Sequence, residues 1–241
     1  MKIISCNIEG DNHLERIIPF FHREHPDVIC VQEMFQNDVG YFEHALNMSA
    51  VFHPLAIVTQ ENGVRMAQKG AWGIAILSRT PNLHSAIYPY FQPESQPPEL
   101  NEDDPNSVHR AILSVDVKVQ DQIWRVATTH FTWSPAGNIV DEQLRDFKEL
   151  SSILDSLQPD ALCGDFNTPR GKEIFGTLAS RFQDTVPAQV KTTVDQNLHR
   201  IPGIQLVIDS IFIQKNIRLL SSKVVDSVSD HQAIVAEIQK V

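Results

Sequence analysis

Polar side chains that can bind metal ions or transfer protons stand at the ends of apolar, strand-like runs along this 241-residue chain. A buried charge destabilises a fold unless it is paired or binds a metal ion. Polar groups repeated at strand ends therefore require the strands to meet at a common site, where one metal ion would satisfy several of them. The residues concerned are Asn7, Glu33, His130, Asp165, Asn167, Asp209, Asp230 and His231.

The apolar runs predict strands that are buried between layers. They cover residues 3–8, 28–31, 71–77, 111–119, 123–130, 161–163, 206–213 and 233–238. Glu33 is expected at the carboxyl end of its strand, and Asp209 inside the run 206–213. Helical periodicity predicts helices over residues 14–21, 39–46 and 144–157, with Pro19 distorting the first. This alternation indicates one α/β domain over residues 1–241.

Two segments, residues 88–109 and 183–205, are expected to be long loops. The first contains several prolines and acids but no Lys or Arg, and its acidic stretch 99–104 is expected to face solvent. The second is polar and irregular. Long loops in compact domains often carry function, so these segments and residues 60–70 are expected to determine substrate specificity.

The formal net charge of −10 and the pI near 5.4 disfavour tight nonspecific binding to a long nucleic-acid duplex. A short nucleic-acid end, a nucleotide or a small phosphoester is compatible with this charge. Cys6, Cys30 and Cys163 lie in apolar runs and are expected to be buried, reduced residues. The sequence shows no signal peptide, transmembrane segment or obligate protein partner, so a cytoplasmic location is expected.

The residue types favour a magnesium site. Carboxylate and amide oxygens suit Mg²⁺ or Mn²⁺, and the absence of a His/Cys cluster argues against structural zinc. Glu33 and Asp230 are candidate metal ligands, to which Asn7 would add a neutral oxygen. His231, oriented by Asp209, would act as a base or stabilise the transition state.

Several short segments, taken in order, resemble the endonuclease/exonuclease/phosphatase superfamily of metal-dependent phosphoesterases. Each tetrapeptide alone is weakly specific, whereas the ordered set spans nearly the whole chain. The segments are Asn7-Ile8-Glu9-Gly10, Val31-Gln32-Glu33, Trp72-Gly73-Ile74-Ala75-Ile76-Leu77-Ser78, Thr129-His130-Phe131, Gly164-Asp165-Phe166-Asn167, Ile208-Asp209-Ser210-Ile211-Phe212 and Ser229-Asp230-His231.

The resemblance implies a DNase I-like fold, a four-layer sandwich of two facing mixed β-sheets flanked by helices. It implies that Glu33 is the principal Mg²⁺ ligand, with Asn7 and Asp230 adjoining, and that Mn²⁺ can substitute. Asp165 would position or deprotonate the attacking water, and Asn167 would hold the water or the phosphate.

The same resemblance assigns groups to the scissile phosphate. His231, supported by Asp209, would contact it, and His130 would serve the leaving-group side. Arg110 matches a family arginine near the phosphate less specifically. Departures from the family pattern are Cys6 and Ser210 in place of aromatic residues, and Phe35 and Phe166 at positions that distinguish particular members.

Structural interpretations compete with some of these roles. Asp165 and Asn167 could form a turn, and Arg110 could be a salt-bridged strand residue. Two further groups stay open at this stage. His199 could line the site from its loop, and base stacking competes with core packing for Trp133, Tyr88 and Tyr90.

The function predicted from these residues is Mg²⁺-dependent hydrolysis of a phosphodiester or phosphomonoester, with a nucleic-acid end or nucleotide as the first choice of substrate. A phospholipid or phosphoinositide substrate is the alternative within the enzyme class. Outside that class, a degenerate relative would bind phosphorylated ligands without turnover. The enzyme is favoured over the binding module because the chain retains Glu33, Asp165, Asn167 and His231, of which a degenerate relative is expected to have lost at least one.

Overall fold

Two β-sheets of six strands each form the centre of the computed structural model, which describes residues 1–60, 66–92 and 96–241. The first sheet has the order β11-β12-β1-β2-β4-β3. The sheet is mixed, because β1 and β2 are parallel whereas all its other pairs of adjacent strands are antiparallel. Its strands are β1 (Lys2–Asn7), β2 (Val28–Phe35), β3 (Ser49–Val58), β4 (Gly70–Ser78), β11 (Ile217–Val225) and β12 (Ala233–Lys240).

The second sheet has the order β5-β6-β7-β8-β10-β9. It is also mixed, with β7 and β8 parallel and the remaining pairs antiparallel. Its strands are β5 (Asn82–Phe91), β6 (Arg110–Val119), β7 (Gln122–His130), β8 (Ala161–Asp165), β9 (Gln183–Asp184) and β10 (Asp209–Ile213).

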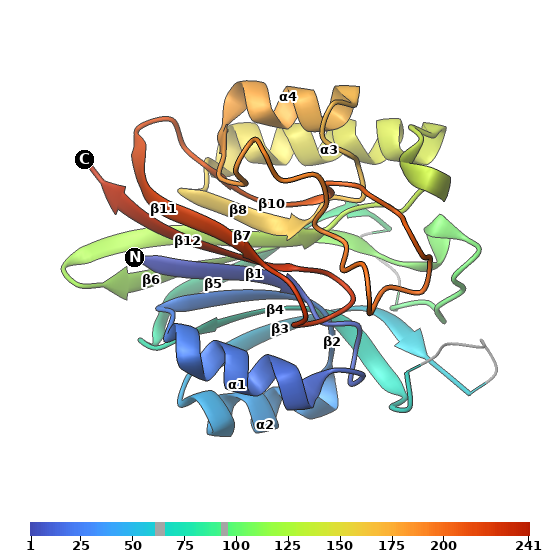
Figure 1. The fold of residues 1–241 in the computed structure, drawn as a ribbon, viewed down its shortest axis with the longest axis horizontal. Coiled ribbons are helices and arrows are strands. Elements are labelled where there is room, and N and C mark those ends of the chain that lie inside the picture. The colour runs from blue at the N-terminus through green and yellow to red at the C-terminus, as the bar shows by residue number, and fades with distance from the viewer. Residues whose placement is uncertain (61–65, 93–95) are drawn as a thin grey trace.

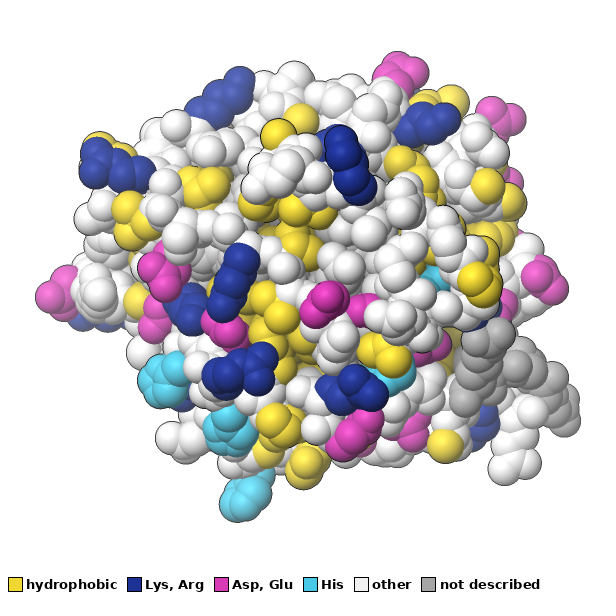
Figure 2. Space-filling view, in the orientation of Figure 1, with side chains coloured by type: hydrophobic (Ala, Val, Ile, Leu, Met, Phe, Trp, Pro, Cys, Tyr) yellow, Lys and Arg dark blue, Asp and Glu magenta, His cyan; other side chains and the backbone are white. Residues whose placement is uncertain are grey.

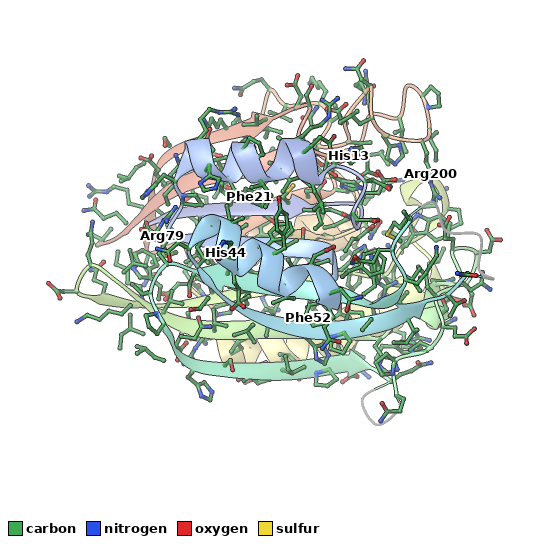
Figure 3. The ribbon with its side chains drawn as sticks, turned by 90° about the horizontal axis from the view of Figure 1, so that it is seen from below. His13, Phe21, His44, Phe52, Arg79 and Arg200 are labelled. Carbon is green, nitrogen blue, oxygen red and sulfur yellow. The ribbon has the colours of Figure 1, made fainter. Side chains whose placement is uncertain are left out.

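Helices cover the outer face of each sheet (Figure 1). Helices α1 (Leu14–Glu24) and α2 (Val39–Leu46) lie side by side on the first sheet, and Phe21 of α1 packs on Phe42 of α2 (Figure 3). Helices α3 (Asp141–Leu157) and α4 (Glu173–Arg181) lie on the second. Short 3₁₀ turns are η1 (Gln36–Asp38), η2 (Pro105–Ser107) and η3 (Pro135–Gly137). The predicted four-layer sandwich is therefore confirmed.

Alternation along the central strands builds three layers of core. Ile3 and Cys30 point between the two sheets, whereas their neighbours Ile4 and Ile29 point toward α1 and α2. In the second sheet, Leu113 faces the first sheet and Ile112 packs under α3. A strand buried on both faces needs apolar residues at consecutive positions, which is why these strands read as continuous apolar runs.

The strands that sequence patterning missed are the edge strands of the two sheets. β3, β5, β9 and β11 are edges, and each is partly exposed along its length. β3 and β5 also contain Pro54 and Pro89, each beside a register shift. Proline lacks the N–H of a strand ladder and is tolerated at edges and bulges. Helix α4 was also missed, and α1 continues through Pro19 to Glu24.

The expected loop 88–109 is shorter than predicted, because β5 extends to Phe91 and residues 105–107 form η2. Of the expected loop 60–70, residues 61–65 lie outside the described part, as do residues 93–95 of the loop 88–109. The segment 183–205 is irregular as expected, apart from the two residues of β9. The three cysteines are buried and free. Within the described residues, no helix is long and apolar enough to cross a membrane.

Gly164 is required where β7 and β8 approach each other. A Cβ atom on Gly164 would lie 2.2 Å from the backbone oxygen of Thr129. Gly164→Ala is therefore expected to lower the free energy of unfolding by about 1–3 kcal/mol, measured by urea denaturation. Gly176→Ala in α4 is the matched control, since no atom lies within 4 Å of its added Cβ. It should raise stability by about 0.5–1 kcal/mol, and equal effects of the two substitutions would contradict the packing argument.

Candidate active site

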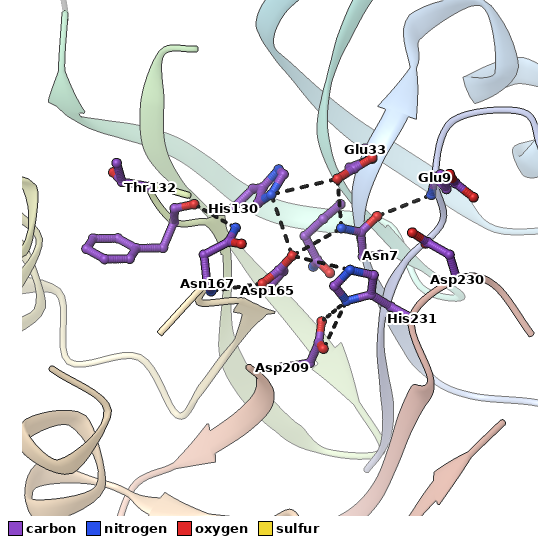
Figure 4. Close-up of polar contacts among 12 residues, drawn as sticks. Asn7, Glu9, Glu33, His130, Thr132, Asp165, Asn167, Asp209, Asp230 and His231 are labelled. Carbon is purple, nitrogen blue, oxygen red and sulfur yellow. Dashed lines mark hydrogen bonds and ion pairs between the residues drawn. The ribbon is translucent and has the colours of Figure 1, made fainter. Parts of the chain in front are cut away.

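The polar residues singled out from the sequence meet at one edge of the sandwich (Figure 4). The carboxyl ends of β1, β7 and β8 carry Asn7, His130 and Asp165. β10 runs antiparallel to β8, so its first residue, Asp209, lies opposite Asp165. Antiparallel pairing of β12 with β1 likewise brings the turn before β12, with His231, to this edge. The strand expected over residues 206–213 begins only at Asp209, so Asp209 is the first residue of β10 rather than an interior one.

Glu33 reaches the site from a bulge within β2 rather than from the end of the strand. The pairing of β2 with β4 shifts between Gln32 and Met34, and Glu33 has a φ of 65°. A bulge adds one residue to a strand and redirects its side chain. The carbonyl of Glu33 accepts a hydrogen bond from the amide of Gly10 at 3.0 Å, which fixes the bulge against the loop after β1.

Asn7 joins two of the carboxylates. Its Nδ2 donates to Glu33 Oε1 at 2.9 Å and to Asp165 Oδ2 at 3.2 Å. Its Oδ1 accepts from the backbone amide of Glu9 at 3.2 Å. In this structure Asn7 therefore orients the two carboxylates as a hydrogen-bond donor, and binding of a metal ion by its Oδ1 stays a prediction.

Asp165 and Asn167 form a turn that is itself part of the site. Asp165 Oδ1 accepts the backbone amide of Asn167 at 2.9 Å, and Asn167 has a φ of 49°. The Asn167 side chain donates to the carbonyl of Phe131 at 3.0 Å. The turn and the position in the site, considered as alternatives from the sequence, are therefore both present: the turn directs Asp165 toward Asn7 and His130.

His231 is oriented by Asp209. Its Nδ1 lies 3.0 and 3.1 Å from the two carboxylate oxygens of Asp209, and its Nε2 lies 3.9 Å from Asp165 Oδ2. Burial by itself lowers the pKa of His231, but the charges of Asp209, Asp230 and Asp165 outweigh burial and raise that pKa well above its usual value. A protonated imidazolium thus faces the cluster of carboxylates.

His130 is the uncharged counterpart. Its Nε2 lies 3.6 Å from Asp165 Oδ2 and 3.8 Å from Glu33 Oε1, and its ring packs on Trp72. Burial, followed by the charge of Arg110, lowers the pKa of His130 well below its usual value. Two histidines with opposite shifts share one site, a pattern associated with distinct roles in proton transfer.

Arg110 is a buried residue at the start of β6, 2% exposed. Its Nη1 donates to the carbonyls of His130 and Phe131 at 3.0 and 3.2 Å. These contacts hold the end of β7, and among the described residues no carboxylate forms the salt bridge to Arg110 that was considered as its alternative role. Contact of Arg110 with a phosphate stays a prediction.

Carboxylates are crowded at this edge. Burial, then the charge of Asp230, raises the pKa of Glu33 to about 8. Burial, then the charge of Asp209, raises the pKa of Asp165 to about 7. Each carboxylate is thus ionised at a cost that a nearby cation would remove. Donor atoms that lie within 4.8 Å of one another form two groups, Asp165 with Asp209 and His231, and His199 with Asp230 and His231.

A cavity of about 560 Å³ opens above these residues. Glu33, His130, Asp165, Asp230 and His231 line its floor, and His199 lines it with a ring 6.1 Å from that of His231. Among the aromatic residues considered for base stacking, Trp133 lines the cavity. Tyr90 is buried and hydrogen-bonded to Thr129, and Tyr88 packs on the core below α3. Core packing is therefore the outcome for both tyrosines.

Two buried residues that sequence patterning did not identify support the site. Gln143 of α3 donates to the carbonyls of Thr132 and Asn167 at 2.8 and 3.0 Å. Thr193 donates to Asp209 Oδ2 at 2.6 Å and accepts from the amides of Ile208 and Asp209. Neither residue lies in a motif or in an apolar run, so their roles depend on contacts distant in the chain.

Thr193→Val is expected to lower kcat about tenfold, because it removes a hydrogen bond to the carboxylate that orients His231. Thr193→Ser keeps the hydroxyl and should retain most of the activity. The measurement is kcat and KM for a chromogenic phosphodiester, together with the urea midpoint of each variant. A positioning role predicts a change in kcat that serine rescues; parallel losses in both variants would contradict it.

Solved structures support the fold. A functionally unknown conserved protein from Enterococcus faecalis has a TM-score of 0.73 at 19% identity, with 100% of each chain covered. D. rerio TDP2 complexed with a single-strand DNA product has a TM-score of 0.70 at 16% identity, covering 100% of this chain and 99% of that chain. A mannosyl-6-phosphatase from Bacteroides thetaiotaomicron has a TM-score of 0.67 at 14% identity, covering 99% of each chain.

Among curated protein sequences, none matches this chain. The sequence profile of the Endonuclease/Exonuclease/phosphatase family, in contrast, matches residues 4–231. This match includes every residue proposed for the site, from Asn7 in β1 to His231, which lies just before β12. The chain belongs to the Endonuclease/Exonuclease/phosphatase family.

Proposed function

We propose that this protein is a Mg²⁺-dependent phosphoesterase that hydrolyses a phosphodiester or phosphomonoester by attack of water. The observation that carries the proposal is the pair formed by Asp209 and His231. The imidazole of His231 lies beside the carboxylates of Asp165 and Asp230, and all three side chains line one cavity. A cation-binding group of acids beside a positively charged histidine suits a substrate that is itself an anion.

The residues present fit a divalent metal ion. Burial and the neighbouring carboxylates raise the pKa values of Glu33 and Asp165, and a hard cation would reverse these shifts. The donor atoms are mostly oxygens, as Mg²⁺ or Mn²⁺ prefers. Glu33 and Asp230 would hold the ion, with Asn7 orienting the Glu33 carboxylate. When bound, the ion supplies positive charge that stabilises the negative charge developing on the phosphate.

The chain's own side chains would carry the proton transfers. Asp165 would accept a proton from the attacking water, with Asn167 holding the turn or the phosphate beside it. His231, kept protonated by its carboxylate neighbours, would donate a hydrogen bond to a phosphate oxygen. On the leaving-group side, uncharged His130 would contact the departing oxygen, and Arg110 would hold His130 in place or contact the phosphate.

A nucleic-acid end or a nucleotide is our first choice of substrate. The neighbour with a bound single-strand DNA product supports it, and the mannosyl-6-phosphatase neighbour supports a phosphomonoester as well. On the face in Figure 2, Lys and Arg side chains of the described residues alternate with Asp and Glu side chains. That distribution suits a short substrate better than a long duplex, whose binding uses extended basic surfaces.

The decisive experiment is a substrate panel under controlled metal. Purified protein, stripped with EDTA, is assayed on bis(p-nitrophenyl) phosphate, p-nitrophenyl phosphate, a single-stranded oligonucleotide and phosphatidylinositol phosphates. Activity is expected on at least one nitrophenyl ester only after Mg²⁺ or Mn²⁺ is restored. Hydrolysis in EDTA would contradict metal dependence. No turnover on any substrate, with metal binding seen by calorimetry, would favour a binding module over an enzyme.

A further inference from the structure

The cavity above the catalytic residues has two chemically different ends. Its floor carries the acids and histidines described above, whereas its walls are mainly apolar. Leu100 and Val108, from the segment 96–109, line one part of these walls, and Ile204 and Leu206, from the segment 190–208, line another, together with Trp133. An apolar chamber that opens onto a charged floor matches an amphipathic ligand with an anionic group at one end.

The walls are held in place by hydrogen bonds to the rest of the fold. On one side, the amide of Leu100 donates to the carbonyl of Ile57 at 2.8 Å, and that of His109 donates to Leu55 at 2.9 Å. These bonds attach the segment 96–109 to the edge strand β3. The cavity wall that this segment forms is therefore ordered before a ligand binds.

The wall residues Ile204 and Leu206 are connected by backbone and side-chain hydrogen bonds to the segment that contacts the site. The amide of Thr193 donates to the carbonyl of Leu206 at 2.8 Å, and the amide of Asp195 donates to the carbonyl of Asp230 at 2.8 Å. Gln196 Nε2 donates to the carbonyl of Ile204 at 2.7 Å. A preformed apolar wall fixed to the catalytic floor can contribute binding energy without an ordering cost on ligand binding.

An ion pair joins the two walls. Arg200 Nη1 lies 2.7 Å from Glu102 Oε2, and both residues line the cavity. The acidic stretch 99–104, expected to be a solvated face, thus supplies part of the cavity, where Leu100 is 7% exposed. This ion pair connects the segments 96–109 and 190–208 at the cavity, and Glu9 and Asp104 on the lining add negative charge that disfavours binding of a polyanion.

We propose that this chamber binds the apolar organic group of a single small phosphoester, so that the enzyme acts on compact substrates rather than on duplex nucleic acid. The proposal rests on the proposed phosphoesterase function and specifies its substrate class. A volume of about 560 Å³ accommodates one ring system or short acyl chain attached to a phosphate. A nucleobase, an aryl group and an aliphatic group share this chemistry.

Binding of non-hydrolysable phosphonates to the Mg²⁺-loaded protein tests the proposal by calorimetry. Phenylphosphonate and butylphosphonate are expected to bind at least about tenfold more tightly than methylphosphonate, because only they bury apolar surface in the chamber. Preference for phenyl over butyl would indicate an aromatic or nucleobase group, and the reverse an aliphatic one. Equal affinity for the three phosphonates, or tighter binding of a short DNA duplex, would overturn the proposal.

Variants of the wall residues test whether the preference for phenylphosphonate and butylphosphonate over methylphosphonate arises in this chamber. Ile204→Asn and Leu206→Asn alter side chains that are only partly buried, and each should reduce the preference over methylphosphonate at least about threefold. Leu83→Asn, on an exposed residue of β5, should leave the preference unchanged. An unchanged preference in both wall variants would overturn the assignment. Because phosphonate binding needs no turnover, selective binding without hydrolysis would refute the proposed function alone, and hydrolysis without selectivity would refute the chamber alone.

Discussion

Asp165→Asn is expected to lower kcat for a chromogenic phosphodiester by about 10³-fold or more. Asparagine keeps the oxygen that accepts the Asn167 amide, so the turn after β8 is preserved. It loses the negative charge and the ability to take a proton from water. It loses the hydrogen bond from Asn7, but it also removes a buried carboxyl group whose pKa is raised to about 7, so the net change in stability should be small and is checked by urea denaturation. The loss of activity would therefore reflect chemistry rather than unfolding.

His231→Ala should have an effect of similar size, because it removes the imidazolium held by Asp209. The double variant should be little slower than either single variant, as expected of residues that act in the same step. Asp116→Asn, on an acid that pairs with Arg125 away from the cavity, is the control and should keep wild-type kcat. Rates near wild type for both single variants would remove Asp165 and His231 from the proposed mechanism.

Glu33→Gln is expected to abolish Mg²⁺-dependent activity while making the metal-free protein more stable at pH 8, by about 1–3 kcal/mol. Glu33 has a folded-state pKa of about 8, compared with its ordinary value of 4.5. Between these values the folded protein retains a proton that the unfolded chain has lost. Stability of the metal-free wild type therefore falls as pH rises from 4.5 to 8, and glutamine removes this dependence.

Urea denaturation in EDTA at pH 5 and pH 8 measures the effect, and the difference between Glu33→Gln and wild type should be larger at pH 8. Glu24→Gln provides a control of opposite sign. Burial raises the pKa of Glu24, but hydrogen bonds from Lys223 and Lys2 outweigh burial and lower it. Its stabilising effect is present above the unfolded pKa and lost as pH falls, so Glu24→Gln should lower stability at pH 8 by about 1 kcal/mol. A destabilising effect of Glu33→Gln at pH 8 would contradict the raised pKa of Glu33, which burial and the charge of Asp230 produce.

The residues of the site could be predicted because buried strands place severe limits on charge. Asp165 follows an apolar run, Asp209 interrupts one and His231 directly precedes one, and an unpaired charge at such positions would be costly. The central strands were found for a related reason, since burial on both faces demands continuous apolar sequence. The edge strands β3, β5 and β11 escaped detection because one face of each is exposed and their residues mix apolar and polar types.

Geometry within the site depended on contacts that no local pattern encodes. The bulge at Glu33 arises from pairing with β4, and Thr193 approaches Asp209 across sixteen residues of irregular chain. The hydrogen bond from the Glu9 amide to Asn7 Oδ1 likewise depends on the loop that follows β1. Such details are fixed by packing between elements distant in sequence, which determines where each side chain points.

The sequence by itself thus determined the family, the fold class and the set of polar residues that meet at one edge. The tertiary structure alone decided how large a substrate that edge admits. The segments 96–109 and 190–208 are almost a hundred residues apart, yet the ion pair between Glu102 and Arg200 joins them over the catalytic floor. Polar residues at strand ends can be recognised from the local sequence, because they interrupt or flank apolar runs. The lining of the chamber comes from segments that meet only after the two sheets have packed.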